Sequence, residues 1–158
     1  MKKIFITIAT IGLLGTSAFA KVEGKKAEKT VAVAYTVKNE FDSTFDNATD
    51  VNWTITNNTQ KATFIQDNVK KTAFYNLQGE YLGVTQSVAY SAIAAKAQKT
   101  IADKYAGYNV GEVIKLQTND TNANFDQTVY FVDLKKDDSE VLVRVTPSAD
   151  VFYFQTVK

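Results

Sequence analysis

Residues 37–53 read VKNEFDSTFDNATDVNW, and this stretch decides the predicted fold because two periods meet in it. Val37, Phe41 and Phe45 recur every fourth residue, which is the spacing of one apolar stripe along a helix. From Val51 onward, apolar residues alternate with polar ones, as in a half-buried strand. So short a helix is stable only when its stripe packs on a sheet. The stretch therefore predicts a helix docked on the strands that follow it.

The predicted first helix spans residues 37–46. Thr36 is its expected N-cap, because a hydroxyl accepts a hydrogen bond from an otherwise unpaired amide, and Asn47 suits its left-handed end. Four strand patterns separated by short polar turns follow it, over residues 51–56, 61–66, 70–77 and 81–85. Connections this short allow only hairpins, so we expect an antiparallel meander.

A second helix is predicted over residues 88–105, where Ile93, Ile101 and Tyr105 share one face and Gly107 follows as the C′ residue. Four more strand patterns come after it, over residues 110–117, 127–134, 140–145 and 151–157. If Val145 pairs with Val151 across the last loop, the side chains of these two strands alternate between two faces of the sheet. The first face carries Val141, Val143, Val145, Val151 and Tyr153, and the second carries Leu142, Arg144, Phe152 and Phe154.

The predicted fold class is α+β, a tandem of two repeats that each consist of a helix and a four-stranded antiparallel meander, with the helices packed on one face of the sheet. The chain would then divide into a signal peptide (residues 1–20), a flexible lead-in or edge strand (21–36), a first repeat (37–86) and a second repeat (87–158). The predicted structural core consists of Phe41, Phe45, Val51, Trp53, Ile93, Ile101 and Tyr105.

The first twenty residues have the pattern of a secretory signal peptide. Two lysines precede an apolar run over residues 4–15, and Ala18-Phe19-Ala20 is a small-x-small cleavage signal. A retained anchor is the less favoured alternative, since the run is too short for a membrane span. We expect cleavage after Ala20 and a periplasmic or secreted protein. The absence of cysteine excludes a lipid-modified cysteine and a disulfide framework.

Charge and composition exclude several classes of function. Without Lys2 and Lys3, the 18 basic and 17 acidic residues become 16 and 17, a net charge of −1. No basic stripe suited to nucleic acid is visible, so no nucleic-acid partner is expected. Histidine is absent as well as cysteine, which excludes a histidine-based triad, a thiol nucleophile, a Cys/His zinc site and haem ligation. We expect no cofactor and no metal, and the oligomeric state is open.

Two acidic segments are candidates for catalysis or for metal binding. Asp137 and Asp138 fall in a predicted hairpin turn, where sequence neighbours do not form the opposed pair that acid–base catalysis needs. Residues 120–126 have the alternating oxygen ligands of a calcium loop. Phe125 stands where that loop requires glycine, however, and Phe131 where it requires glutamate. Both segments are interpreted as polar turns.

The pattern Val37-x3-Phe41-x3-Phe45-x2-Ala48-x2-Val51-x-Trp53 resembles the PepSY-like family, often described as β-lactamase-inhibitor-protein-like. Residues 75–82, a strand ending in tyrosine followed by a glycine turn and another strand, are also similar to it. The second half matches in residues 101–105 and 113–116 but lacks the tryptophan and the glycine turn. The resemblance implies a small exported bacterial protein with helices on one face of an antiparallel sheet and the other face open to a partner.

The candidate binding residues are aromatic, aliphatic and basic side chains of the last strands: Arg144, Phe152, Phe154, Tyr130 and Leu142. An arginine stacked on aromatics is a common interface anchor, although its stem alone also covers apolar sheet surface. Trp53 alternates with two apolar residues, so a core role is favoured over a binding role.

These features predict an exported, non-catalytic binding module that presents an open sheet face with aromatics to another extracytoplasmic protein and that acts as an inhibitor or a related binder. The alternative is a carrier of a small apolar ligand or lipid, with a cavity between sheets and helices. A carboxylate-based hydrolase is the third and least favoured reading, because no catalytic residues are identified.

Overall fold

The computed structural model describes residues 33–119 and 126–157. The predicted signal peptide and the lead-in up to residue 32 lie outside the described residues. The elements in chain order are α1 (Tyr35–Thr44), β1 (Thr49–Ile55), β2 (Gln60–Gln66), β3 (Val69–Tyr75), β4 (Tyr81–Val88), the 3-10 turn η1 (Tyr90–Ala92), α2 (Ala95–Lys104), β5 (Asn109–Thr118), β6 (Thr128–Lys136), β7 (Ser139–Val145) and β8 (Val151–Thr156).

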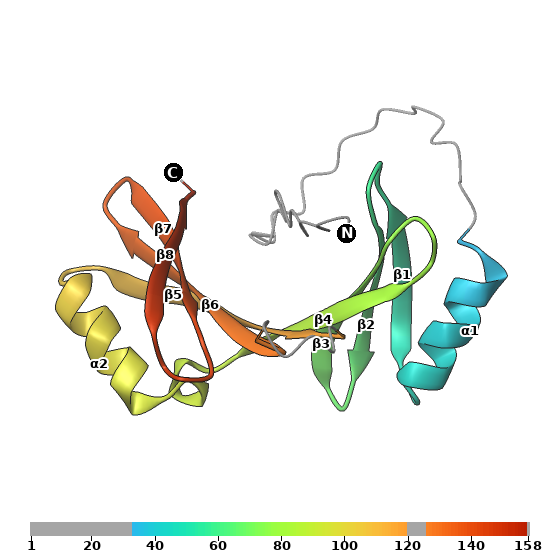
Figure 1. The fold of residues 1–158 in the computed structure, drawn as a ribbon, viewed down its shortest axis with the longest axis horizontal. Helices are drawn as coiled ribbons and strands as arrows, with labels where there is room; N and C mark the ends of the chain where they lie inside the picture. Colours follow the sequence, from blue (N-terminus) through green and yellow to red (C-terminus); the bar gives the residue numbers. More distant parts are fainter. Residues whose placement is uncertain (1–32, 120–125, 158) are drawn as a thin grey trace, which may run out of the picture. The chain divides into compact units, whose positions relative to one another are not determined.

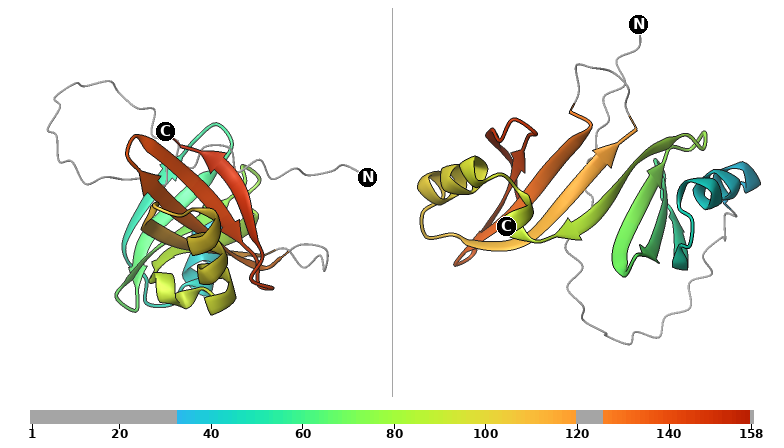
Figure 2. Two further views of the ribbon diagram at one scale, coloured as in Figure 1. Left: turned by 90° about the vertical axis from the view of Figure 1, so that its left-hand side faces the viewer. Right: turned by 90° about the horizontal axis from the view of Figure 1, so that it is seen from below.

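The strands form one eight-stranded antiparallel sheet in the order β1-β2-β3-β4-β5-β6-β7-β8 (Figures 1 and 2). The predicted fold class, a tandem of two helix-plus-four-strand repeats, is therefore wrong. The protein is a single meander that carries two short helices. The alternative of a carrier with a cavity between sheets and helices stays a prediction, and the described residues form one sheet rather than two.

The pairing of β4 with β5 makes the sheet continuous. It extends without a register shift from Gly83↔Thr118 to Val88↔Val113. Gly83 has φ +151°, and a Cβ atom at this position would lie 2.4 Å from the carbonyl oxygen of Gln117. Glycine is therefore required at this position, where the backbone of β5 leaves no room for a side chain.

The α1 core is built around Phe41, whose side chain is 2% exposed. The Phe41 ring contacts those of Phe45, Trp53 and Phe64 at centroid distances of 5.2, 5.4 and 4.9 Å. Trp53 itself is half-buried. Val51, predicted as core, is instead 39% exposed, because a register shift in β1 between residues 49 and 52 interrupts the alternation.

The N-cap of α1 is also not the predicted one. The amides of Val37 and Lys38 donate to the carbonyl oxygen of Ala34, so the helix begins at Tyr35 and Thr36 lies within its first turn. No side chain caps this end. At the other end, Asn47 has φ +61°, which confirms its left-handed conformation.

A second core lies under α2, where Ile93 and Ile101 are 2% and 3% exposed. The predicted helix over residues 88–105 is too long, because Ile93 is extended (φ −85°, ψ 151°) and separates η1 from α2. Gln98 Nε2 donates to the Ile93 carbonyl oxygen at 2.9 Å and holds this break. Tyr105, the C-cap residue, is half-buried against the same core.

Both helices cover the same face of the sheet. Val84 packs into the α1 core and Val88 into the α2 core, and these residues lie four apart in an uninterrupted part of β4. Since side chains alternate along a strand, both point to one side. The residues that alternate with these along the strands point to the other side of the sheet. Neither α-helix of the described residues covers that side, which we call the helix-free face. Neither α1 nor α2, the two α-helices of the described residues, is long and apolar enough to cross a membrane.

Candidate binding face

The candidate site is the helix-free face over β6, β7 and β8, and strand register places its side chains. Val132, Val143 and Val145 point toward α2 and are buried. Their neighbours in sequence therefore point the other way. Phe131 pairs with Arg144, and Arg144 pairs with Phe152, so the arginine lies between two aromatics of adjacent strands.

An aromatic pair and an ion pair fix this part of the face. Phe131 and Phe154 pack edge to face, with ring centroids 4.9 Å apart. Arg144 Nη2 donates to Asp126 Oδ2 at 2.7 Å, and both side chains are about one-third exposed. The pair orients the guanidinium, which carries five N–H donors in all. Phe152 and Phe154 are 53% and 42% exposed.

The predicted binding residues do not all share this face. Val145↔Val151 pairing is confirmed, and it places Arg144 and Phe152 together as expected from alternation. Leu142 pairs with Asp133 on the same side. Tyr130 is the exception. It pairs with Val145 and packs against the α2 core, so it lies on the helix-covered face and is not part of the site.

Sequence reasoning missed a charged cluster on the same face. Asp133 is only 2% exposed, although it stands in an apolar strand between Val132 and Leu134. Lys135 Nζ lies 3.1 Å from Asp133 Oδ2 and 3.2 Å from Glu140 Oε1. The sequence does contain a signal for this cluster: Asp133 is an acidic residue between two apolar residues, Val132 and Leu134, of a predicted strand.

Burial dominates the electrostatics of this cluster. Desolvation raises the pKa of Asp133, the ion pair with Lys135 opposes the rise, and the charge of Glu140 adds to it. Contact with Asp133, and then with Glu140, raises the pKa of Lys135. A Cβ atom on Gly111 would lie 2.4 Å from Asp133 Oδ2, so β5 covers the carboxyl group at a glycine. Asp133 Oδ1 has no hydrogen-bond partner in the described part of the chain.

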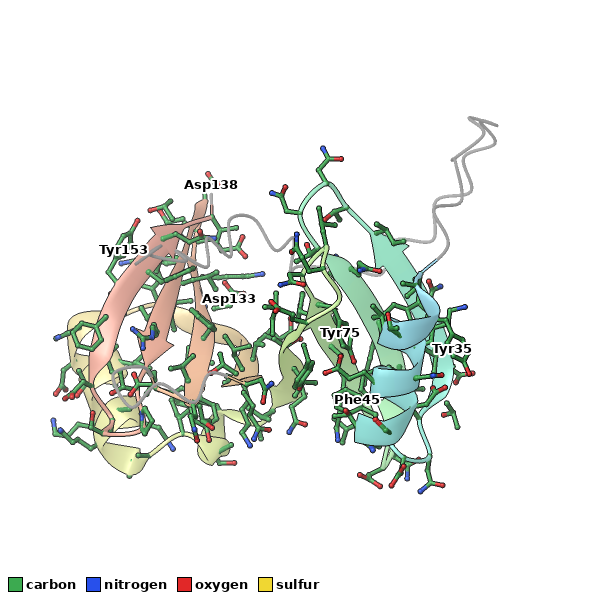
Figure 3. All side chains as sticks on the ribbon, turned by 45° about the vertical axis from the view of Figure 1, so that its right-hand side comes forward. Tyr35, Phe45, Tyr75, Asp133, Asp138 and Tyr153 are labelled. Carbon is green, nitrogen blue, oxygen red and sulfur yellow. The ribbon has the colours of Figure 1, made fainter. Side chains whose placement is uncertain are left out.

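The two acidic segments considered from sequence lie outside this arrangement. Asp137, which has φ +50°, and Asp138 are exposed in the β6–β7 turn. Figure 3 labels Asp138 in this turn. Of the calcium-like segment, residues 120–125 lie outside the described residues, and Asp126 is the partner of Arg144. Over residues 33–119 and 126–157, no group of three or more acidic side chains is placed to hold a metal ion.

Comparison with known proteins gives similarity at the level of the fold. No family model matches the chain, and no curated protein matches it. A DUF2874 family protein from Bacteroides uniformis has a TM-score of 0.70 at 13% identity, covering 80% of this chain and 91% of its own. A BLIP-like protein from Bacteroides fragilis has a TM-score of 0.69 at 13% identity, with coverages of 82% and 89%.

A third structure, described as a candidate periplasmic protein from Bacteroides eggerthii, has a TM-score of 0.70 at 13% identity and covers 80% of this chain and 90% of its own. Such identities show a shared fold and nothing finer. This chain has the fold of the BLIP-like and DUF2874 structures. The PepSY-like part of the resemblance has no support, since no family model matches.

Proposed function

We propose that the protein is an exported, non-catalytic binding module whose helix-free face receives another extracytoplasmic protein. One observation carries the proposal: Phe152 and Phe154 stand about half exposed beside Arg144 on a face that no described helix covers. Aromatic residues and arginine are the side chains most enriched at binding hot spots. The fold shared with a BLIP-like structure and with a candidate periplasmic protein supports both the binding role and export.

The charges of the face specify the kind of partner. In the part of this face formed by β6 and β7, Arg144 and Lys135 are exposed cations, with side chains 38% and 48% exposed, and each contacts a carboxylate of this chain. A carboxylate of the partner would accept hydrogen bonds from the remaining N–H donors of the Arg144 guanidinium. We therefore expect the partner to present a surface loop that carries an acidic side chain beside an apolar one, which would pack on Phe152 and Phe154.

Site-specific crosslinking tests the proposal. A photoreactive phenylalanine analogue replaces Phe152 or Phe154 in cells that export the protein, and the same analogue at Tyr35 is the control. Tyr35 is 77% exposed on α1 and points away from the sheet's helix-free face (Figure 3). We expect one discrete product from residues 152 and 154 that is absent from residue 35. Equal products at all three positions, or none at 152 and 154, would overturn the proposal.

Binding of the captured and purified partner then tests the role of the arginine. Arg144→Ala should weaken binding about tenfold or more, because truncation at a hot spot costs about 1–2 kcal/mol or more. Lys99→Ala is the matched control, since Lys99 is an exposed cation of α2 that is paired with Asp103 at 2.7 Å. A partner that binds both variants equally does not use this face.

A further inference from the structure

The sheet has two edge strands, β1 and β8, which differ in how they are protected. In the described residues, each pairs with a neighbouring strand on one side only (Figure 1). The amides and carbonyls along the other side of an edge strand are unpaired within the sheet, so they are a template for a further strand. Folded proteins protect such edges with charged residues, proline or a β-bulge. The residues of the two strands therefore indicate which edge is open.

β1 has this protection. Its pairing with β2 shifts register between Thr49 and Asn52, and Asp50, within the shifted segment, has φ +54°. A charged residue in a left-handed conformation interrupts the regular backbone with which an added strand would pair. β1 is therefore a poor template for another strand.

β8 is less protected. Residues 151–157 read VFYFQTV and contain no charged residue, no proline and no glycine. All of them except Gln155 are aromatic or β-branched, the types that favour strands. The register shift between β7 and β8 leaves Phe154 as an extra residue of β8, but it brings no charge to the edge. Among the described residues, β8 is thus the edge that a further strand can join.

Three successive aromatic residues make this edge apolar on both faces of the sheet. Phe152, Tyr153 and Phe154 are 53%, 60% and 42% exposed. Phe152 and Phe154 lie on the helix-free face, whereas Tyr153 pairs with the buried Val143 and lies on the helix-covered face. A strand added to β8 would therefore shield aromatic surface on both faces as well as pair with the backbone.

We propose that β8 pairs with β8 of a second copy of this chain in an antiparallel, two-fold symmetric arrangement. When the pair is centred on Tyr153, Phe152 of each copy lies opposite Phe154 of the other copy on the helix-free face. Such cross-strand aromatic pairs stabilise a sheet. This inference goes beyond the proposed function, since it concerns the edge of the sheet and needs no other protein.

Charge favours a second copy as the occupant. Because residues 151–157 are uncharged, two copies of the strand bring no like charges together. Selection of one particular foreign strand relies largely on complementary charges, and β8 has none to offer. A two-fold pair also uses the open edge of each copy, so the assembly closes at two copies.

The area of the contact predicts a weak dimer. With about 200 Å² for a fully exposed aromatic residue, the accessible parts of the three rings amount to roughly 300 Å² per copy. Two copies would bury roughly 600 Å² of aromatic surface, which is less than the total of about 1,200 Å² in a standard stable interface. Hydrogen bonds between the two backbones must supply the rest. We therefore expect dimer formation to depend on protein concentration.

Sedimentation velocity of the purified protein over about a hundredfold range of concentration tests the dimer. We expect the monomer to convert to a dimer as concentration rises. Tyr153→Lys opposes two like charges at the centre of the pair and should raise the dissociation constant about tenfold or more. Tyr35→Lys, at an exposed tyrosine of α1, is the matched control and should leave it unchanged. A monomer at every concentration, assemblies larger than a dimer, or equal dimerisation of both variants would overturn the proposal.

An introduced cysteine locates the contact independently. Because the chain contains no cysteine, Tyr153→Cys can form a disulfide only between copies. Opposed residues of antiparallel strands have Cα atoms about 4.5–5.5 Å apart, which suits a disulfide. Mild oxidation should link Tyr153→Cys faster than Tyr35→Cys, and equal rates would overturn the proposal.

These outcomes are separate from those of the proposed function, because the purified protein is measured without any other protein. In the crosslinking experiment in cells, a product with twice the mass of the chain is the dimer and does not count as the partner.

Discussion

At the scale of single residues, the helix-free face contains side chains that sequence patterns place and others that they do not. Arg144, Leu142 and Phe152 share one side because strand alternation requires it, so a sequence argument finds them. The Asp126 partner of Arg144 lies 18 residues away, and no local period links the two. The burial of Asp133 depends on the backbone of β5 and on Lys135, and both are set by tertiary structure.

The ionisation of Asp133 predicts how stability depends on pH. A carboxyl group whose folded pKa is raised stabilises the fold in its protonated form. That contribution is full below the unfolded pKa, about 3.9, and is lost as pH rises through the raised folded pKa. Asp133→Asn imitates the protonated form. We expect its free energy of unfolding to exceed that of the wild type by a margin that grows as pH rises above about 4.

Urea denaturation between pH 4 and 8 measures this margin. Asp138→Asn is the matched control, because it removes an exposed carboxylate from the neighbouring turn and should give a curve parallel to that of the wild type. If the free energy of unfolding of Asp133→Asn also runs parallel to that of the wild type between pH 4 and 8, the burial of Asp133 does not govern the pH dependence of stability.

At the scale of elements, local periodicity predicts that a helix or strand exists better than it predicts the residues at which that element begins and ends. The four-residue stripe of Phe41 and Phe45 indicates α1, and both rings are buried against the sheet. Its start was missed because the Ala34 carbonyl, rather than the Thr36 hydroxyl, accepts the first amides. The break at Ile93 was missed because an alanine-rich segment favours helix, whereas the tertiary contacts of Ile93 and Gln98 favour an extended residue.

The packing of α1 predicts a large cost for one substitution. Phe41→Ala removes a ring that touches three other aromatics in a closed core and should lower the free energy of unfolding by about 3–5 kcal/mol. Tyr35→Ala, on the exposed side of the same helix, should change it by less than about 0.5 kcal/mol. Trp53 is the only tryptophan and contacts Phe41, so its fluorescence reports both denaturation curves. Similar losses for the two variants would contradict the docking of α1.

At the scale of the whole molecule, the sequence predicted antiparallel hairpins but not the continuity of the sheet. Hairpins follow from short connections, whereas β4 and β5 are separated by η1 and α2. No periodicity within either strand predicts that β4 pairs with β5. The sequence pattern therefore predicts two separate repeats with a boundary after residue 86. The glycine at position 83 allows the two backbones to approach, but its role is visible only once Gln117 is placed beside it.

Continuity of the sheet is what gives the protein one helix-free face rather than two small separate ones. Phe74 of β3 and Leu116 of β5 are both buried on this side, and the strands between and beside them connect α1's half of the meander to the Arg144 region. The proposed partner would therefore meet a surface backed by a single hydrogen-bonded framework.

The most direct test of this framework is nuclear magnetic resonance of the β4–β5 junction. Cross-strand Overhauser effects between residues 83–88 and 113–118, with slow amide exchange in both strands, are the result predicted by the continuous register. Absence of these effects, with rapid exchange of the amides that face across the junction, would show two separate sheets and contradict the account.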